Sequence, residues 1–464
     1  MNIKTILSFA MGPIAAAALG LLCVPLIAWI FNPEDVGKMS LVVVFASFCN
    51  LVFNLGLDQA YVREYYESNN KQSLLIMTFI PGLLILIFVL FFLSFYSASI
   101  IQTVFDLNSD TIFFVISIYF LTVYVSRYVT LILRMQGRAM AYSFSQFVPK
   151  ALLILLLLSF LFFSFSVEFL YLVTAHLLAL LLTTIFFIWY TWEEWKLALT
   201  SSIDKIKLKS MLVFGLPLIF ASLSFWGMTS IDRVFLRYYS GFDELGIYSV
   251  AVNFAGVAII LQSVFSTIWS PMVYRWIAEG VELNRVFAIT NWMVAIIGVL
   301  FSLAGLFSWV IPYLLPPSFS EVQYIFVACL GYPLFYTLSE TTVVGINVTK
   351  KTKYSMLAGV IALCINVFAN YMFVPLYGAK GAAISTALSF WVFFVCRTEF
   401  SSRVWIKMKK REKIYIKTLT YMLCVILFVL FGEEHFIIFT GIFLILLTTC
   451  SMRIFKMYKK MNVN

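Results

Sequence analysis

Long apolar stretches separated by short polar links run along almost the whole chain. A helix needs about 20 apolar residues to cross a bilayer, and the sequence repeatedly offers stretches of that length. The pattern predicts an all-α polytopic membrane protein with 14 transmembrane helices. The predicted spans are residues 5–31, 40–57, 73–96, 111–134, 143–163, 167–190, 211–238, 246–276, 284–311, 321–346, 354–375, 380–400, 414–432 and 435–452.

Two links are longer and more polar than the others. They are TWEEWKLALTSSIDKIKLKS (191–210) and SSRVWIKMKKREK (401–413), and they divide the predicted helices into groups of six, six and two. The predicted domains are an N-terminal six-helix bundle (1–190), a cytoplasmic linker (191–210), a C-terminal six-helix bundle (211–400), a basic cytoplasmic linker (401–413), and helices 13 and 14 with a basic tail (414–464).

The two six-helix halves resemble each other in their links. NPEDVGKMS (32–40) and GFDELGIYS (241–249) both read acid, acid, aliphatic residue, glycine, two variable residues, serine. RAMAYS (138–143) and KKTKYS (350–355) occupy equivalent later links. Because each half has an even number of helices, both halves have the same orientation. This predicts a parallel pseudo-repeat, an arrangement found in secondary transporters.

Composition agrees with this class and fixes an orientation. Hydrophobic residues make up 62% of the chain and charged residues 12%, with a mean hydropathy of +0.97; a soluble domain carries about 25% charged residues. Most lysines and arginines fall in alternate links and in the two tails, which predicts that both termini are cytoplasmic. The net charge of +10 is therefore topological, and we expect binding to membrane lipid rather than to nucleic acid.

The sequence lacks the common signatures of enzymes and metal sites. The seven cysteines lie in apolar stretches without ligand-like spacing, and there is no phosphate-binding loop, H-E-x-x-H pair or G-x-S-x-G elbow. The outer links are short, whereas an enzyme acting on sugars at that face usually needs a larger polar loop. The prediction is a transporter with no metal and no cofactor, rather than an enzyme.

Charged residues inside one predicted span need an explanation. A charge at the centre of a bilayer costs at least about 2.5–3.5 kcal/mol, yet Asp232, Arg233 and Arg237 precede the end of the span 211–238. Trp226, Arg233 and Arg237 share one helical face, while Asp232 points about 100° away from Arg233. Two arginines on one face favour an anionic ligand or water, although Arg237 could also extend to the outer surface.

Polar residues in other spans suggest a water-filled cavity between the halves with a basic balance, which favours an anionic substrate. The asparagines could equally form hydrogen bonds between helices, and this is the favoured interpretation for Asn366 and Asn370. The candidate substrate-binding residues are Arg127, Lys150, Trp226, Arg233 and Arg237. The candidate gating or ion-coupling residues are Asp58, Asp232 and Glu340. The candidate polar lining consists of Asn50, Asn54, Asn253 and Asn370.

Several ordered motifs resemble those of one transporter family. They are FGLPLIFASLSFWGMTSIDRVFLRYYSGFDELGIYSVA (214–251), NVFANYMFVPLYGAKGAAISTALS (366–389), FNPEDVGKMS (31–40) and LGLDQAYVREYY (55–66). The chain is similar to Wzx-type polysaccharide flippases, which move O-antigen or capsule repeat units. That family belongs to the multidrug/oligosaccharidyl-lipid/polysaccharide exporter superfamily. Asp232 and Arg233 match its motif directly, whereas Arg127 and Lys150 lie outside the motifs.

The resemblance implies a fold and a substrate. The fold is two six-helix bundles arranged as a V around a central cavity, as in MATE exporters, plus two C-terminal helices. The substrate is an oligosaccharide on an undecaprenyl-diphosphate carrier, moved from the inner to the outer leaflet of the bacterial cytoplasmic membrane by alternating access. Other polysaccharide assembly proteins are expected partners. The alternatives are a lipid II flippase, a cation-coupled multidrug exporter or, from another class, a membrane polysaccharide polymerase or ligase.

Overall fold

The regular structure of the described chain is helical throughout. The structure, a computed structural model, describes residues 3–163, 168–279, 284–408 and 410–462. Residue 167, the predicted start of one span, and Lys409 of the predicted basic linker lie outside them. Within the described residues, 13 helices are long and apolar enough to cross a membrane. The predicted all-α polytopic class is confirmed, and the count of 14 crossings stays a prediction.

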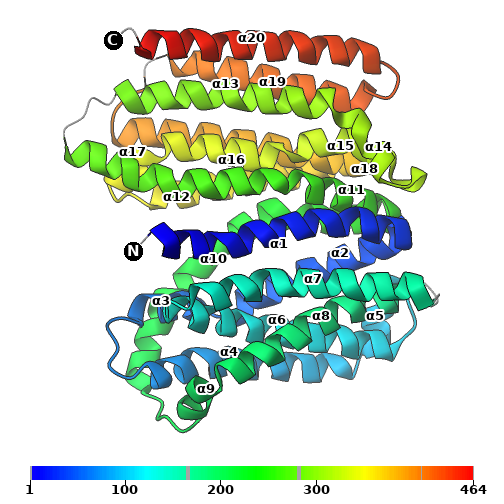
Figure 1. Ribbon diagram of the computed structural model, residues 1–464, viewed down its shortest axis with the longest axis vertical. Helices are drawn as coiled ribbons and strands as arrows, with labels where there is room; N and C mark the ends of the chain where they lie inside the picture. Colours follow the sequence, from blue (N-terminus) through cyan, green and yellow to red (C-terminus); the bar gives the residue numbers. More distant parts are fainter. Residues whose placement is uncertain (1–2, 164–167, 280–283, 409, 463–464) are drawn as a thin grey trace. The chain divides into compact units, whose positions relative to one another are not determined.

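The chain divides into two compact units, residues Met1–Leu223 and Ser224–Asn464. The boundary falls inside the long helix α10 and not in the linker 191–210, and the predicted domain limits stay a prediction. The long helices of each unit run alongside one another (Figure 1). Helices of the first unit are α1 (Ile3–Ile30), α2 (Pro33–Phe53), α3 (Leu57–Glu64), α4 (Lys71–Ser94), α5 (Ser97–Phe105), α6 (Asp110–Met135), α7 (Ala139–Phe163), α8 (Phe169–Tyr190), α9 (Trp192–Leu199) and the first part of α10 (Lys205–Tyr239).

The second unit contains the rest of α10 and all later helices. Its elements are α11 (Phe242–Ala255), α12 (Val257–Ala278), α13 (Asn284–Leu306), η1 (Ser308–Val310), α14 (Ile311–Leu314), η2 (Pro317–Phe319), α15 (Val322–Cys329), α16 (Gly331–Thr342), α17 (Val344–Val348), α18 (Lys353–Val404), α19 (Arg411–Phe431) and α20 (Phe436–Asn462). The predicted single spans 246–276 and 321–346 are thus each broken, the first at Gly256 and the second at two short interruptions.

The repeated link motif marks the start of a helix in both units. In α2, the side chain of Asn32 accepts a hydrogen bond from the backbone N–H of Asp35 at 2.8 Å, and Pro33 occupies the first turn. In α11, Gly241 has a φ of 89° and the first turn again carries two acids. Acidic side chains stabilise the positive end of a helix. The predicted links 32–40 and 241–249 are therefore mostly helical, and α2 begins earlier than predicted.

Helix α2 also ends earlier than predicted. Leu55 and Gly56 both have positive φ, 53° and 69°, so the chain turns before α3. The helix of the predicted span 40–57 therefore ends at Phe53, and the candidate Asp58 lies in the separate helix α3.

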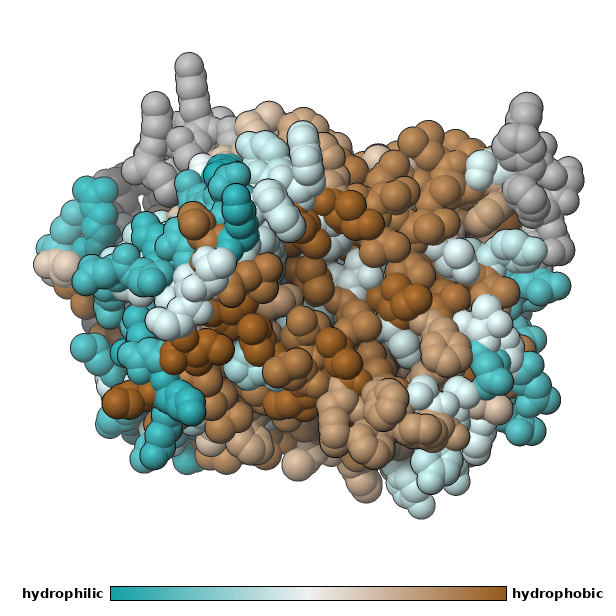
Figure 2. Space-filling model, turned by 90° about the horizontal axis from the view of Figure 1, so that it is seen from below, coloured by the Kyte–Doolittle hydropathy of each residue, from teal (hydrophilic) through white to brown (hydrophobic). Residues whose placement is uncertain are grey.

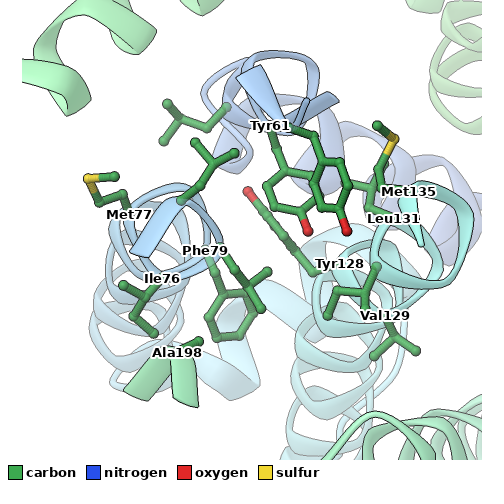
Figure 3. Close-up of a cluster of buried hydrophobic side chains, with 14 of the residues drawn as sticks. Tyr61, Ile76, Met77, Phe79, Tyr128, Val129, Leu131, Met135 and Ala198 are labelled. Atoms are coloured by element: carbon green, nitrogen blue, oxygen red, sulfur yellow. The ribbon is translucent and has the colours of Figure 1, made fainter. Parts of the chain in front are cut away.

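A hydrophobic core cluster of the first unit lies between α3, α4, α6 and α9, and several aromatic rings take part in it (Figure 3). The ring of Phe79 lies 5.2 Å from that of Tyr128 and 5.0 Å from that of Trp195. Each tyrosine hydroxyl donates to a carbonyl of α4: Tyr128 to Thr78 at 2.6 Å and Tyr124 to Phe79 at 2.8 Å. These bonds give each buried hydroxyl a partner where water has no access. The tyrosine rings can therefore lie inside an apolar core.

The outer surface suits a lipid environment. One face of the molecule carries a broad apolar band, with hydrophilic residues gathered toward its ends (Figure 2). Large apolar side chains are exposed on long helices, among them Phe88 and Phe91 of α4 and Phe186 of α8. Exposed apolar surface of this extent is rare on soluble monomers and is expected where lipid covers the protein.

Element α18 has 52 residues and contains two predicted spans. A straight helix of that length would be about 78 Å long, far more than the ~30 Å of hydrocarbon. At Gly378 the backbone is non-helical, with φ 51° and ψ −128°. Asn366 donates to Ser389, 23 residues later, at 3.2 Å, whereas in a straight helix those residues would be about 35 Å apart. The two arms are therefore antiparallel, with Gly378 at the turn.

We expect Gly378→Ala to destabilise the protein. The left-handed φ strains any side chain there, and an added Cβ would lie 2.8 Å from Cδ of Glu244, whose carboxylate accepts from the N–H of Ala379 at 2.8 Å. The expected loss is about 1–3 kcal/mol, measured as a lower melting temperature in detergent. Gly441→Ala is the control, since an added Cβ meets nothing within 4 Å. Equal stability of the two variants would contradict the role of Gly378.

Candidate buried carboxyl site

Asp232 of α10 is fully buried in the second unit and accepts three side-chain hydrogen bonds. One of its oxygens accepts from the Tyr248 hydroxyl at 2.6 Å and from the Thr386 hydroxyl. The other accepts from the amide of Asn370 at 2.8 Å. The exposed fraction of Asp232 is 0%. Because a buried charge is costly unless hydrogen-bonded, this set of donors is what allows a carboxyl group to occupy that position.

The turn at Gly378 builds this cluster. It brings Asn366 and Asn370 on one arm of α18 against Thr386 and Ser389 on the other. Asn370 also donates to Asn366, at 2.9 Å to its carbonyl and 3.1 Å to its side-chain oxygen. Residues three or four apart share a helix face, so each arm presents its polar pair to the same place. Asp232 and Asn370, predicted as separate candidates, are thereby brought together.

The two arginines that follow Asp232 are half-buried and contact aromatic rings. Arg233 donates to the carbonyl of Thr229 at 2.9 Å, and its guanidinium lies 5.7 Å from the ring centre of Tyr248. The guanidinium of Arg237 lies 4.4 Å from the ring centre of Phe242. Both contacts are within the range of cation–π interactions. Trp226 is half-buried on the same helix.

Glu340 forms an ion pair that the sequence does not reveal. Its carboxylate lies 2.7 Å from Nη1 of Arg397 on α18, and the two side chains are only 12% and 11% exposed. Arg397 also donates to the Ser339 hydroxyl at 2.8 Å and lies over the Phe393 ring at 4.7 Å. Arg397 is the charged partner that the sequence analysis missed. It stands near the end of its helix, where the positive-inside rule already accounts for a basic residue.

In the first unit, Arg127 is paired with Asp58. Two of its nitrogens, Nε and Nη2, donate to one oxygen of Asp58 at 3.2 and 2.7 Å. The exposed fractions are 33% for the arginine side chain and 12% for the aspartate. Gln59 adds a third donor to the same oxygen at 3.1 Å. Two candidates predicted for different roles therefore neutralise each other here.

The remaining candidates are dispersed. Lys150 of α7 and Asn253 of α11 are exposed on their units. Asn54 caps the end of α2 and donates to both oxygens of Asn50, the side-chain one at 2.7 Å. These two asparagines contact each other at the end of α2.

The Asp232 cluster has a definite chemical capacity. Tyr248 and Thr386 carry hydroxyl groups that can rotate to donate or accept, so the site can hold a carboxylate or a protonated acid without losing its framework. Arg233 next to it holds a planar set of donors suited to phosphate or carboxylate oxygens. Within the described residues, no group of three or more histidine, cysteine, aspartate or glutamate side chains could hold a metal ion.

Curated relatives match part of the chain. Multidrug resistance protein NorM of Vibrio vulnificus is 26% identical over 210 residues, which is 41% of this chain and 44% of NorM. MdtK of Cronobacter sakazakii is 23% identical over 218 residues, 44% of this chain and 46% of MdtK. The chain thus matches less than half the length of these relatives.

Solved structures match nearly the whole chain. The lipid II flippase MurJ in an inward closed conformation has a TM-score of 0.68 at 16% identity, covering 97% of this chain and 98% of MurJ. An inward-facing MATE transporter of the MOP superfamily has a TM-score of 0.58 at 17% identity, covering 87% of this chain and 96% of that one. Identities this low show a shared fold.

The family assignment rests on a match to more than half of the chain. The profile of a family described as polysaccharide biosynthesis protein matches residues 3–275, which include α1 to α11, most of α12 and therefore Asp232 and both arginines of α10. The family resemblance found in the sequence motifs is confirmed. This chain shares its fold with MurJ and MATE proteins, and it belongs to the polysaccharide biosynthesis protein family.

Proposed function

We propose that the protein flips undecaprenyl-diphosphate-linked oligosaccharides from the inner to the outer leaflet of the bacterial cytoplasmic membrane, with both termini in the cytoplasm. The observation that carries this proposal is the match of residues 3–275 to the polysaccharide biosynthesis protein family. A shared fold with a lipid II flippase adds support, because that protein is named for a lipid-linked substrate. On this proposal the protein is a transporter and not an enzyme.

A diphosphate head cannot cross ~30 Å of hydrocarbon unaided, so the protein must replace its water. We propose that Arg127, Lys150, Trp226, Arg233 and Arg237 contact the head group. Arg233 is the principal contact, since it lies beside a fully buried acid and matches the family motif. Arg127 reaches phosphate only when it leaves Asp58, its partner at 2.7 Å. That exchange gives Asp58 a gating role.

Asp232 is the proposed ion-coupling residue. It is the one candidate acid whose described hydrogen-bond donors are all neutral, Tyr248, Thr386 and Asn370, so a bound proton or cation would change the charge of the cluster. Glu340 already has Arg397 as its counter-ion and serves as a gate. Asn370 supports Asp232, while Asn50, Asn54 and Asn253 belong to the polar lining of the pathway.

A multidrug exporter is the second candidate, favoured by the similarity to NorM and MdtK. A strain lacking this gene distinguishes the two. We expect carrier-linked oligosaccharide to accumulate on the cytoplasmic leaflet, surface polysaccharide to disappear, and drug susceptibility to stay at the parental level. The gene supplied on a plasmid should restore the surface polysaccharide. Increased drug susceptibility without carrier accumulation would reject the flippase and support the exporter.

A further inference from the structure

A second polar site lies along α16 in the second unit, where α12 and α18 each pack against that helix. Three buried side-chain atoms there have no hydrogen-bond partner among the described residues: Oε1 of Gln262, Oγ of Ser266 and Nε of Arg397. Buried polar atoms in proteins nearly always have partners, and each exception calls for a water molecule or a ligand. Together they provide an acceptor, a hydroxyl and a donor.

Contacts with α16 relate these atoms to one another. Gln262 interacts with the hydroxyl of Tyr332. Seven residues after Gln262, the indole of Trp269 donates to the carbonyl of Glu340 at 2.9 Å. Ser266 lies between them on the same face of α12, and the guanidinium of Arg397 is paired with Glu340. We call this group of residues the polar seam. Its members are Gln262, Ser266, Tyr332, Tyr336, Glu340 and Arg397.

Aromatic rings border the polar seam. The ring centre of Phe225 lies 6.1 Å from that of Tyr332 and 5.6 Å from that of Tyr336. The Tyr336 ring stacks on Phe393 at 6.0 Å. Phe225, Tyr332 and Tyr336 are only half-buried, so part of each residue is exposed on the second unit. Sites that bind small molecules typically combine aromatic side chains with a small number of polar groups.

The charge of the polar seam narrows the class of ligand. Glu340 and Arg397 neutralise each other at 2.7 Å, so an isolated phosphate or a cationic drug gains little from the seam. A neutral ring with several hydroxyl groups matches it better, since hydroxyls both donate and accept. The C–H faces of a sugar can also lie on the electron-rich aromatic faces.

We propose that the polar seam binds the saccharide part of the cargo through its hydroxyl groups. This inference rests on the proposed function, and it separates recognition of the sugar from recognition of the diphosphate by Arg233. Ordered water offers the same hydroxyl chemistry, so the test must tell the two sources apart.

The test compares two carriers that differ only in the sugar. Protein in lipid nanodiscs is titrated with undecaprenyl diphosphate and with undecaprenyl-diphospho-N-acetylglucosamine. We expect the wild type to bind the sugar-bearing carrier about three- to tenfold more tightly, as one or two additional hydrogen bonds would give. Gln262→Leu and Ser266→Ala should lose this preference and keep the affinity for undecaprenyl diphosphate.

A matched variant separates a lost ligand contact from a damaged fold. Ser302→Ala also removes a buried serine hydroxyl from the second unit, but that hydroxyl donates within α13, to Gly298 at 2.7 Å, and the preference should remain. Because Oγ of Ser266 has no partner among the described residues, Ser266→Ala should not lower the melting temperature. Gln262→Leu should lower it only slightly, since it also removes the contact with Tyr332.

Each other outcome rejects the inference in a distinguishable way. Equal affinity of the wild type for both carriers, or an unchanged preference in both seam variants, leaves ordered water as the occupant of the polar seam and overturns the sugar site. Failure of the wild type to bind either carrier rejects the proposed function itself, and the sugar site with it.

Discussion

Asp232→Asn is expected to abolish transport while the protein stays folded. The asparagine keeps the shape of the side chain. Its carbonyl oxygen can still accept from Asn370, and its NH2 group can donate to the Tyr248 and Thr386 hydroxyls, which rotate to accept. The loss of stability should be about 1 kcal/mol or less once the cost of a buried charge is also removed. It cannot exchange a proton or balance a cation. Surface polysaccharide should therefore be undetectable in a deletion strain that carries this variant at wild-type protein level.

Two further variants make the result interpretable. Asp243→Asn makes the same change at an exposed acid of α11 and should transport normally. Asp232→Ala leaves three donors without an acceptor, at about 1–3 kcal/mol for each unsatisfied group, so it should lower the melting temperature where Asp232→Asn does not. Wild-type transport by Asp232→Asn would show that the charge of Asp232 plays no part in the cycle.

Arg233→Ala should also eliminate surface polysaccharide at a normal protein level. The residue is half-buried and donates to the carbonyl of Thr229 at 2.9 Å, and its guanidinium has the fork geometry that phosphate oxygens match. Alanine removes both the charge and the fork. Arg233→Lys restores the charge alone, so we expect partial recovery of polysaccharide export.

The control for this series is an arginine of the same unit with an exposed side chain. The side chain of Arg275 is 78% exposed and pairs with Glu279, one turn later at the end of α12, an interaction worth about 0.3–0.5 kcal/mol. Arg275→Ala should retain wild-type export. Full export by Arg233→Ala would exclude Arg233 from the substrate site, and equal export by the lysine and arginine forms would exclude a bidentate contact.

The apolar pattern predicts the membrane helices well because each span needs only length and hydropathy. It places their limits less well where local chemistry extends or interrupts a helix. Asn32 and Pro33 start α2 within a segment that looks like a polar link, and the positive φ values at Leu55 and Gly56 end it. Both features depend on a few backbone angles, to which an average over 20 residues is insensitive.

The candidate site is predicted less completely because its contacts join distant parts of the chain. Asp232 and Arg233 stand out, since charge is expensive in a span. Their surroundings do not: Asn370 and Thr386 follow 138 and 154 residues later. Arg397 escapes notice for the same reason, because nothing in its own helix indicates Glu340, 57 residues earlier. Spacing within a helix indicates a face, while only the tertiary fold determines the partner.

The distance along the chain between Asp232 and its donors also bears on biosynthesis. At about 5–20 residues per second, the ribosome needs roughly 8–30 s to add the 154 residues that separate Asp232 from Thr386. During that interval the nascent chain holds an acid whose later donors do not yet exist. Until then, protonation or a position near the lipid head groups must spare the Asp232 carboxylate the cost of burial as a charge. The second unit therefore completes its folding only after the hairpin around Gly378 has been inserted.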